Sequence, residues 1–458
     1  MAANTESYDM VVVGGGTGGC FAAATAAREG IDVVLLERKS EDEGGYIACG
    51  DGIKGKSTFP DVVDRDRLRA ESFTNEGITR GIFENPHSGG SIEIPFDETG
   101  AVVDRYRYGQ VLLEETERAG AEIHYETVVN DVIQPDERVE GVTAVRDGTP
   151  LEYEADVVVD AAGALSVLQD YADLSNSTFD TNVDYTQFCS AYREVLEVPE
   201  PVEWDDALVF KPTDELGYLW YFPRSATEIN AGLGFQMDGE PLELIDTLEN
   251  DIASHPELAD ATVKNKLGAA LPTRRPYDSA VHPGYVAVGD AAGHVNPCTG
   301  GGIPGAAKAG HWAAEIAVEA IEDGDVSEAG LWAYNHRVQT DFGKRFAAMD
   351  LYNVFGTAHE LDDLVSVLTA LPGQQLVDAI GKRGTAEMGL GLKLKTLVES
   401  IGHWDVLYEL YRVQNAAETL KDVYDSYPDD PVGFESWKRE RDGVLETVYD
   451  VTGADPKY

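Results

Sequence analysis

The residues near the start of the chain that are best suited to chemistry are three glycines and a glutamate. Gly14, Gly16 and Gly19 have the spacing Gly-x-Gly-x-x-Gly directly after the apolar run Met10–Val13, and Glu37 ends the next apolar run. In this pattern the first glycine permits a tight turn, the second lets the backbone approach a pyrophosphate, and the third lets a helix pack on a strand. A carboxylate about 20 residues further on accepts hydrogen bonds from ribose hydroxyls. These residues predict a dinucleotide site.

The neighbouring segments are those that such a site needs. Met10–Val13 predicts a buried parallel strand, Ala22–Ala27 continues a helix after the glycines, and Ile31–Leu36 predicts the next strand. The N–H groups and the dipole at the start of that helix favour a diphosphate. The sequence has a strand, a loop, a helix, a second strand and an acid in the expected order and spacing. This pattern favours a dinucleotide site over the alternative, a glycine-rich turn in an unrelated α/β fold.

A second glycine-rich block lies far downstream. Gly289 and Asp290 end the apolar run that starts at Tyr285, and Gly300–Gly302 precede a helix expected over Pro304–Ile321. Asp290 can accept hydrogen bonds from the ribityl hydroxyls of a flavin, and the N–H groups at the helix start can stabilise charge at the flavin N1–C2=O edge. Two separated glycine loops suit a long cofactor such as FAD better than a compact NAD module.

An aromatic stripe is expected in the middle of the chain. Tyr218, Trp220 and Phe222 fall on one face if residues 217–222 form a strand, because side chains alternate with period two. Such a stripe can bind a long polyprenyl chain, and its π faces can stabilise a developing carbocation. It can equally be the core of a second domain, and the residues alone leave both interpretations open.

The four cysteines, Cys20, Cys49, Cys189 and Cys298, include no Cys-x-x-Cys pair, so no metal site and no iron–sulfur cluster are predicted. Cys49 stands in a glycine-rich loop at 44–53 that we expect to approach a flavin ring, which makes it our first candidate for a proton donor. The alternative is a buried, inert thiol. A redox disulfide between Cys49 and Cys298 is also left open.

Composition indicates an unusually acidic globular protein. Asp and Glu number 83 against 35 Lys and Arg, giving a formal net charge of −48, while 43% of the residues are hydrophobic. The acids are dispersed, as expected for a cytoplasmic protein of a high-salt cell, where salt screens self-repulsion. This charge disfavours free nucleic acid as a partner. No apolar run approaches the ~18 residues that span a bilayer, and no targeting segment is seen, so we expect a cytoplasmic protein or one bound peripherally at the cytoplasmic membrane face.

The order of the expected elements predicts an α/β fold. We expect a discontinuous Rossmann-like FAD-binding domain of the glutathione reductase type (1–175 and 276–330), an inserted antiparallel sheet domain for the substrate (176–275) and a helical region (331–458). Within the first part, Leu151–Glu154 is expected to end a β meander, and Ala155–Gly163 to form a separate buried strand.

The chain resembles the geranylgeranyl reductase family of flavoproteins, within the class related to p-hydroxybenzoate hydroxylase. The resemblance covers about residues 8–345 and rests on the Gly14–Gly19 fingerprint with Glu37, on the block Gly289–Ile303, and on Tyr218–Pro223, which matches the family motif Tyr-x-Trp-x-Phe-Pro. Archaeal members saturate the geranylgeranyl chains of ether phospholipids, and the acidity fits a halophilic archaeon. The function implied is FAD-dependent reduction of isoprenoid double bonds in lipid biosynthesis.

The resemblance also implies roles for individual residues. Expected FAD contacts are Gly14, Gly16, Gly19, Glu37, Arg38, Cys49, Gly50, Arg105, Val129, Gly289, Asp290, Gly301, Gly302 and Ile303. Arg105 is expected near the phosphates and Cys49 beside the flavin. The isoprenoid chain is expected to lie against Tyr218, Trp220, Phe222 and Pro223. After Cys49, weaker candidates for the acid are Tyr218 and His294, and His294 is equally well interpreted as a structural loop residue. Asp160-Ala-Ala-Gly163 replaces the Asp-Gly-x-Gly of many relatives, which weakens the expectation of a pyrophosphate contact there.

The electron donor is left open. Gly232-Leu-Gly234 and Gly389-Leu-Gly391 lack the third glycine of a nicotinamide fingerprint, so transiently bound NAD(P)H and a carrier protein such as a reduced ferredoxin both remain. Lys54 and Lys56 could attract a substrate phosphate, or could be solvated side chains. Alternative functions are an aromatic monooxygenase, a reductase of quinone isoprenoid side chains, and a quinone-linked electron-transfer flavoprotein.

Overall fold

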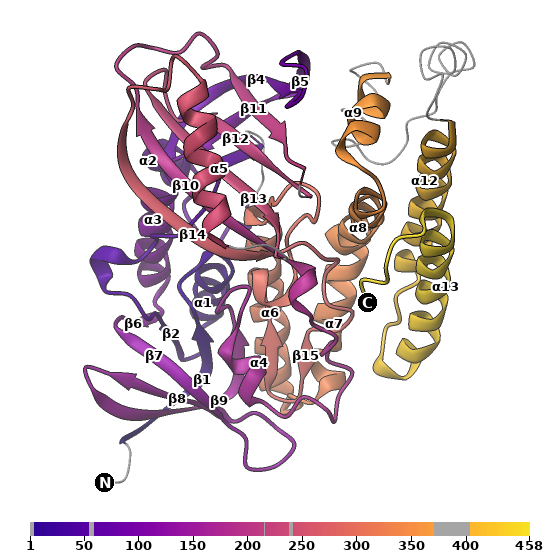
Figure 1. Ribbon diagram of the computed structural model, residues 1–458. Helices are drawn as coiled ribbons and strands as arrows, with labels where there is room; N and C mark the ends of the chain where they lie inside the picture. Colours follow the sequence, from indigo (N-terminus) through magenta and orange to yellow (C-terminus); the bar gives the residue numbers. More distant parts are fainter. Residues whose placement is uncertain (1–3, 55–58, 215, 238–240, 371–403) are drawn as a thin grey trace.

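The computed structural model describes residues 4–54, 59–214, 216–237, 241–370 and 404–458. Within them, two eight-stranded sheets are joined by helices (Figure 1). In that view the first sheet lies at the bottom, the second at the top, and the C-terminal helices on the right. Lys56 and Gly389–Gly391, considered above, lie outside the described residues.

The first sheet is organised around β1 (Asn4–Val13), which pairs in parallel with β2 (Val33–Leu36) and β9 (Thr149–Asp160). The order of its main path is β15-β16-β9-β1-β2-β6, and β7 and β8 extend it from β9. The other strands are β6 (Glu122–His124), β7 (Thr127–Ile133), β8 (Gly141–Arg146), β15 (Val281–His282) and β16 (Tyr285–Ala287). The parallel strands expected at Met10–Val13, at Ile31–Leu36 and from Tyr285 are confirmed as β1, β2 and β16.

One expectation for this sheet was wrong. Leu151–Glu154 and the run that begins at Ala155 form a single strand, β9, rather than two. The first half of β9 pairs antiparallel with β8, and its second half pairs in parallel with β16, while β1 runs beside most of its length. The change of partner along one strand explains why the pattern changes from alternating to continuously apolar.

Helices pack closely over this sheet. α1 (Thr17–Glu29) contacts both α3 (Arg105–Ala119) and α6 (Ile303–Asp323). A Cβ on Gly310 of α6 would lie 2.0 Å from the carbonyl oxygen of Gly18, so glycine is needed for the two helices to touch here. Two short helices, α2 (Arg65–Ser72) and α4 (Val167–Tyr171), belong to the N-terminal half of the sequence.

The second sheet has the order β14-β10-β13-β12-β11-β4-β5-β3, and all its pairs are antiparallel except β4 with β11. Its strands are β3 (Gly52–Lys54), β4 (Phe73–Glu84), β5 (Ser91–Val103), β10 (Phe188–Glu197), β11 (Ala207–Pro212), β12 (Gly217–Pro223), β13 (Glu228–Gln236) and β14 (Thr262–Pro272). The segment 176–275 therefore shares its sheet with three strands from 52–103. β14 was not anticipated, because most of its side chains are exposed or half-buried and give no clear alternation.

The two faces of the second sheet have different neighbours. On one face, α5 (Pro241–Ser254) covers a core that includes Leu219, Tyr221, Leu233 and Leu248. Because neighbours along a strand point to opposite faces, Tyr218, Trp220 and Phe222 lie on the other face, where Trp220 and Phe222 form a separate apolar cluster. The sheet thus presents its aromatic stripe away from α5.

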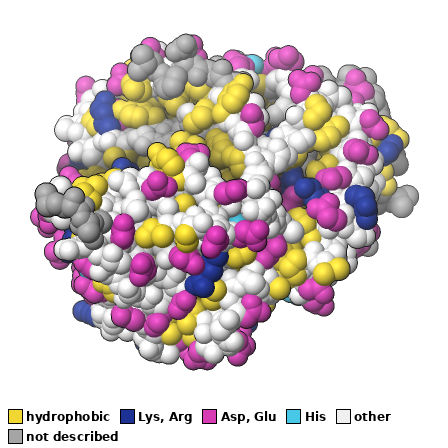
Figure 2. All heavy atoms as spheres, turned by 90° about the horizontal axis from the view of Figure 1, so that it is seen from below, with side chains coloured by type: hydrophobic (Ala, Val, Ile, Leu, Met, Phe, Trp, Pro, Cys, Tyr) yellow, Lys and Arg dark blue, Asp and Glu magenta, His cyan; other side chains and the backbone are white. Residues whose placement is uncertain are grey.

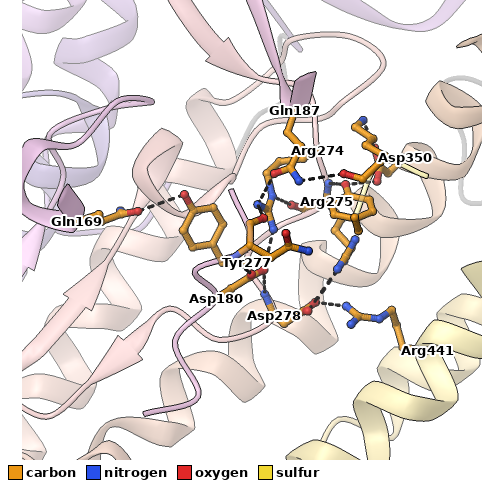
Figure 3. Close-up of polar contacts among 12 residues, drawn as sticks. Gln169, Asp180, Gln187, Arg274, Arg275, Tyr277, Asp278, Asp350 and Arg441 are labelled. Carbon is orange, nitrogen blue, oxygen red and sulfur yellow. Dashed lines mark hydrogen bonds and ion pairs between the residues drawn. The ribbon is translucent and has the colours of Figure 1, made fainter. Parts of the chain in front are cut away.

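The last C-terminal helix is joined by buried charges to the segment that follows the second sheet. The C-terminal helices are α7 (Glu328–Val338), α8 (Lys344–Thr357), α9 (Leu361–Ala370), α12 (Trp404–Asp425) and α13 (Phe434–Thr452). Figure 3 shows Arg275, which follows β14, and Arg441 of α13 both directed at Asp278. Beside them Arg274 pairs with Asp180 at 2.6 Å. The Arg441–Asp278 pair connects α13 to this segment, and removing either partner would be strongly destabilising because it leaves a buried charge unpaired.

The acidic side chains are spread over the surface. Figure 2 shows Asp and Glu dispersed over the face that it presents, with few Lys and Arg among them and no single acidic region. None of the described helices is long and apolar enough to cross a membrane.

Candidate active site

The turn between β1 and α1 has the geometry expected of a pyrophosphate loop. Gly14 has φ of 104°, and a Cβ there would lie 2.4 Å from the carbonyl oxygen of Ala161. A Cβ on Gly19 would lie 2.0 Å from the carbonyl oxygen of Gly14, so the helix can approach the strand only without a side chain. At Gly16 a Cβ would meet no atom within 4 Å, which leaves open space beside the start of α1. This combination fits a diphosphate at the helix N-terminus.

Glu37 is held in place at the end of β2. Its two carboxylate oxygens accept hydrogen bonds from the N–H groups of Gly15 and Lys39, both at 2.8 Å. Thr127 donates its N–H to the Glu37 carbonyl at 2.9 Å, so the start of β7, two residues before Val129, lies beside this residue. Arg38 next to it is exposed. The buried, fixed carboxylate fits a ribose at this end of the site.

Arg105 is a buried arginine beside the glycine loop, with one nitrogen unpartnered in the described part of the chain. Its side chain is 4% exposed, and Nη2 donates to Thr17 Oγ1 at 3.3 Å, at the first turn of α1. Nη1 is buried and has no partner among the described residues. A buried guanidinium without a carboxylate is unfavourable, so this geometry fits an anion such as the FAD diphosphate between Arg105 and the glycine loop.

The second glycine-rich block lies against the first. A Cβ on Gly18 would lie 3.2 Å from Val288 Cγ2 and 3.8 Å from the Gly289 nitrogen, which places the two loops side by side. Burial raises the pKa of Asp290 to about 6, and the positive charge of Arg105 opposes this. Two loops about 270 residues apart in sequence therefore contact each other, as a single cofactor that spans both would require.

The start of α6 completes this part of the site. Gly302 precedes the helix, no side chain caps it, and its first residues are Ile303 and Pro304. A Cβ on Gly302 would lie 3.5 Å from Asp290 Oδ1, so the carboxylate and the open N–H groups lie together. The pair fits the ribityl chain and the pyrimidine edge of a flavin.

The Cys49 loop faces these elements from the second sheet. Cys49 Sγ accepts a hydrogen bond from the N–H of Asp51 at 3.2 Å, and Asp51 has φ of 69°. Burial and the negative charge of Asp51 raise the pKa of the Cys49 thiol, while Arg105 and Arg193 oppose this. The thiol therefore keeps its proton at neutral pH, as a proton donor must.

The aromatic stripe connects the Cys49 loop with the second glycine block. A Cβ on Gly50 or Gly52 would lie 3.1 to 3.4 Å from the rings of Trp220 and Phe222, so these rings cover the loop. At the other end Tyr218 donates its hydroxyl hydrogen to the carbonyl oxygen of Thr299 at 2.8 Å. The rings are 6.1 Å apart between Tyr218 and Trp220, and 6.3 Å between Trp220 and Phe222. An apolar surface therefore spans the two loops that would hold a flavin ring.

His294 has a structural role in this geometry. It is 1% exposed, and its Nδ1 accepts the N–H of Gly289 at 3.1 Å. Burial lowers its pKa to about 3, so it is a neutral imidazole that holds the second loop. The structure therefore favours the loop-residue interpretation over the catalytic one.

The remaining sequence candidates are placed as follows. Asp160 is fully buried, and its carboxylate accepts from Tyr285 and from the N–H of Ala162, so it orders the end of β9. Cys49 and Cys298 are both free thiols, and Cys298 donates to the carbonyl oxygen of Met349 in α8 at 3.0 Å. Tyr218 has its pKa raised by burial.

Four residues of the site were not singled out from the sequence. They are Asp51, which stands in the Cys49 loop, and Arg193 of β10, Arg224 directly after β12 and Asn230 of β13, which surround that loop. Asp51 belongs to the Cys49-Gly50-Asp51 motif that the resemblance places beside the flavin, but no feature of the sequence assigned it a role of its own. Nothing local marks Asn230, whose contact with Cys49 joins positions 181 residues apart.

The comparisons with known proteins agree with this geometry. A family model described as FAD dependent oxidoreductase matches residues 9–214. A digeranylgeranylglycerophospholipid reductase of Sulfolobus acidocaldarius is 28% identical, with 96% of this chain and 97% of that protein covered. A reductase of the same name from Methanopyrus kandleri is 31% identical over 74% of this chain and 84% of its own length.

Solved structures share the fold. A geranylgeranyl bacteriochlorophyll reductase-like protein from Thermoplasma acidophilum has a TM-score of 0.72 at 24% identity, covering 90% of this chain and 100% of that one. The myxobacterial FAD-dependent halogenase CndH has a TM-score of 0.59 at 19% identity, covering 98% and 97%. The curated reductases match this chain in sequence, and these solved structures match it in fold. The chain therefore belongs to the family of digeranylgeranylglycerophospholipid reductases, which are FAD-dependent oxidoreductases.

Proposed function

We propose that this protein saturates isoprenoid double bonds in the geranylgeranyl chains of an archaeal ether phospholipid, with FAD as its cofactor. Relatives named digeranylgeranylglycerophospholipid reductase align with this chain over most of their length. The residue types and spacings of both glycine loops, and the Arg105 Nη1 that has no partner among the described residues, fit the cofactor.

The observation that carries the proposal is the position of the aromatic stripe. Trp220 and Phe222 lie against the Cys49 loop, and Tyr218 is bonded to the loop that precedes α6. A flavin between Glu37 and the start of α6 would have its ring end beside this surface. Aromatic rings there suit a long apolar chain and leave little room for water.

For this reaction the protein must supply a proton donor and a surface that stabilises positive charge. A trisubstituted alkene is not polarised, so it must be protonated as hydride arrives. FAD, when reduced and bound, supplies the hydride. We assign the proton to the Cys49 thiol, whose raised pKa keeps it protonated at neutral pH. The faces of Trp220 and Phe222 would stabilise the tertiary cation character that protonation creates. The thiolate left on Cys49 must recover a proton from solvent before the next double bond.

Two cations offer a place for the phosphate of the substrate. Lys54 follows the Cys49 loop on β3, and Arg345 stands in the first turn of α8. Neither lies within ion-pair distance of a carboxylate among the described residues, although the negative charge of Glu98 acts on Lys54 and that of Asp341 acts on Arg345. Burial and the positive charge of Arg345 lower the pKa of Lys54, and the negative charge of Glu98 opposes this. A lipid phosphate between Lys54 and Arg345 would relieve the repulsion between these two cations.

This assignment predicts a selective effect of neutralising both cations. With Lys54→Gln and Arg345→Gln together, KM for the phospholipid should rise at least about tenfold, the ratio for one charge-assisted contact of about 1.5 kcal/mol, while kcat changes little. The uncharged diether alcohol serves as the matched substrate. An equal rise in KM for both substrates would contradict a phosphate subsite at these residues.

The electrons come from one of two classes of donor, transiently bound NAD(P)H or a reduced carrier protein such as a ferredoxin. Among the described residues, Gly232 and Gly234 lie in β13 rather than at a strand-to-helix turn, so they form no nicotinamide loop. Dithionite replaces either donor in the test that follows.

The test is mass spectrometry of lipid products. The purified holoprotein, in high salt because of its charge of −48, is reduced with dithionite and supplied with digeranylgeranyl glycerophospholipid. We expect products heavier by successive pairs of hydrogens. Unchanged lipid in a preparation that holds FAD would refute the proposal. Saturation of a polyprenyl quinone side chain alone would favour the quinone reductase, and NADPH oxidation driven by O₂ and an aromatic acid would favour the monooxygenase.

A further inference from the structure

A buried asparagine joins the aromatic stripe to the Cys49 loop. Asn230 of β13 is fully buried, and its Oδ1 accepts the indole N–H of Trp220 at 2.9 Å. Its Nδ2 donates to the carbonyl oxygen of Cys49 at 2.9 Å and to Asp51 Oδ2 at 2.5 Å. One amide thus uses both donors and an acceptor to connect three residues of the site.

The backbone that Asn230 holds is strained. Asp51 has φ of 69°, a conformation that residues other than glycine rarely adopt, and its side chain is fully buried. Arg224 binds Asp51 Oδ2 through Nε at 2.8 Å and through Nη2 at 2.6 Å. The N–H of Asp51 in turn points at Cys49 Sγ. Arg224 and Asn230 together therefore maintain the turn that presents the thiol.

The indole at the other end has little freedom. A Cβ on Gly232 would lie 2.1 Å from the Trp220 ring, and one on Gly50 would lie 3.3 Å from its Nε1, so the ring is packed between a strand and the Cys49 loop. A chain that displaces this ring would move Asn230, and with it the peptide group of Cys49.

We propose that Asn230 is a positioning residue that couples contact of the isoprenoid chain with Trp220 to the placement of the Cys49 thiol. The proposal deepens the proposed function and rests on it, because it concerns the same reaction. Aspartate does not reproduce the three bonds because it lacks the two donors, and leucine or alanine leaves the Trp220 N–H, the Cys49 carbonyl and Asp51 without this partner.

The test is a double-mutant cycle with thiol alkylation as its readout. Asn230→Ala removes all three bonds, and Trp220→Phe keeps an aromatic ring but removes the N–H. In the oxidised holoprotein without lipid, the rate of iodoacetamide labelling at Cys49 is measured by peptide mass spectrometry, with the buried thiols Cys20 and Cys189 as internal references. The double variant completes the cycle.

We expect Asn230→Ala to change the labelling rate of Cys49 at least about fivefold, the ratio that corresponds to one net hydrogen bond of about 1 kcal/mol. Trp220→Phe should change it in the same direction, and the double variant should show less than the product of the two effects. With lipid, kcat should fall in Asn230→Ala while KM changes little. If Asn230→Ala does not fold, Trp220→Phe alone still has to shift the Cys49 rate.

Asn335 provides the matched control. It is 1% exposed and also uses its amide to bind its neighbours, Ser279 Oγ and the N–H of Ala280, but it does not touch the Cys49 loop. Asn335→Ala should lower stability and leave Cys49 labelling unchanged. Unchanged labelling in Asn230→Ala, independent effects in the cycle, or an equal shift in Asn335→Ala would each overturn the proposal. Coupled labelling in a protein that leaves lipid unchanged would instead refute the proposed function.

Discussion

Arg105 allows a prediction in which stability and cofactor affinity change in opposite directions. Its guanidinium is 4% exposed, has one neutral hydrogen-bond partner in Thr17, and has no partner at Nη1. An unsatisfied buried donor costs about 1–3 kcal/mol, and attraction to Asp290 offsets part of this cost. Arg105→Met keeps an unbranched apolar side chain and removes the charge together with the contact of the guanidinium with the Tyr108 ring at 4.9 Å, so it should stabilise the cofactor-free protein by about 1 kcal/mol at most.

The same change should weaken FAD binding. Loss of a charge-assisted hydrogen bond to a phosphate costs about 1.5–3 kcal/mol, which corresponds to a Kd raised about ten- to hundredfold. Urea unfolding of the cofactor-free protein and quenching of flavin fluorescence measure the two quantities separately. Lower stability together with unchanged FAD affinity would show that Arg105 is an ordinary core residue, and would refute this reasoning.

Three further predictions concern the ring end of the site. Cys49→Ala should retain FAD while reduction of the lipid slows by about 10²–10⁴, the usual contribution of a general acid, as measured by product mass spectrometry; full activity would exclude Cys49 as the donor. Asp290 has its pKa raised to about 6 by burial, so the cofactor-free folded state resists its ionisation. The free-energy cost of ionising Asp290 in the folded state is absent below about pH 4, grows up to pH 6 and then reaches about 3 kcal/mol. Asp290→Asn should therefore stabilise the cofactor-free form at pH 7.5 but hardly at pH 4. Equal unfolding free energies of the two proteins at pH 7.5 would contradict the shift. Gly232→Ala places a Cβ 2.1 Å from the Trp220 ring, so it should abolish lipid reduction with FAD still bound, and a wild-type rate would show that the ring position is unimportant.

Local patterns were sufficient for the elements that hold the cofactor. The run Met10–Val13, the three glycines and Glu37 lie within about 30 residues, and each imposes its geometry through neighbours in sequence or through a single strand pair. The same is true of Gly289 and the start of α6. Their convergence could be predicted because both loops follow the carboxyl ends of strands in a parallel sheet, where such ends meet at one edge.

Long-range pairing limited the prediction elsewhere. β3–β5 belong to the second sheet because β4 pairs with β11, more than 120 residues away, and no local pattern specifies that partner. Asn230 looks like an ordinary polar residue in a strand until its contact with Cys49 is seen. His294 was ambiguous for the same reason, since its role depends on a hydrogen bond from Gly289 and on a buried setting that a sequence does not display.

The most direct measurement is a crystal structure of the holoprotein with a saturated diphytanyl lipid analogue. We predict FAD extending from Glu37, past Arg105, to the start of α6, with its ring beside Cys49 and an isoprenoid chain against Trp220 and Phe222. A flavin bound away from the contact between Gly18 and Gly289, or a lipid chain on the face covered by α5, would contradict the account.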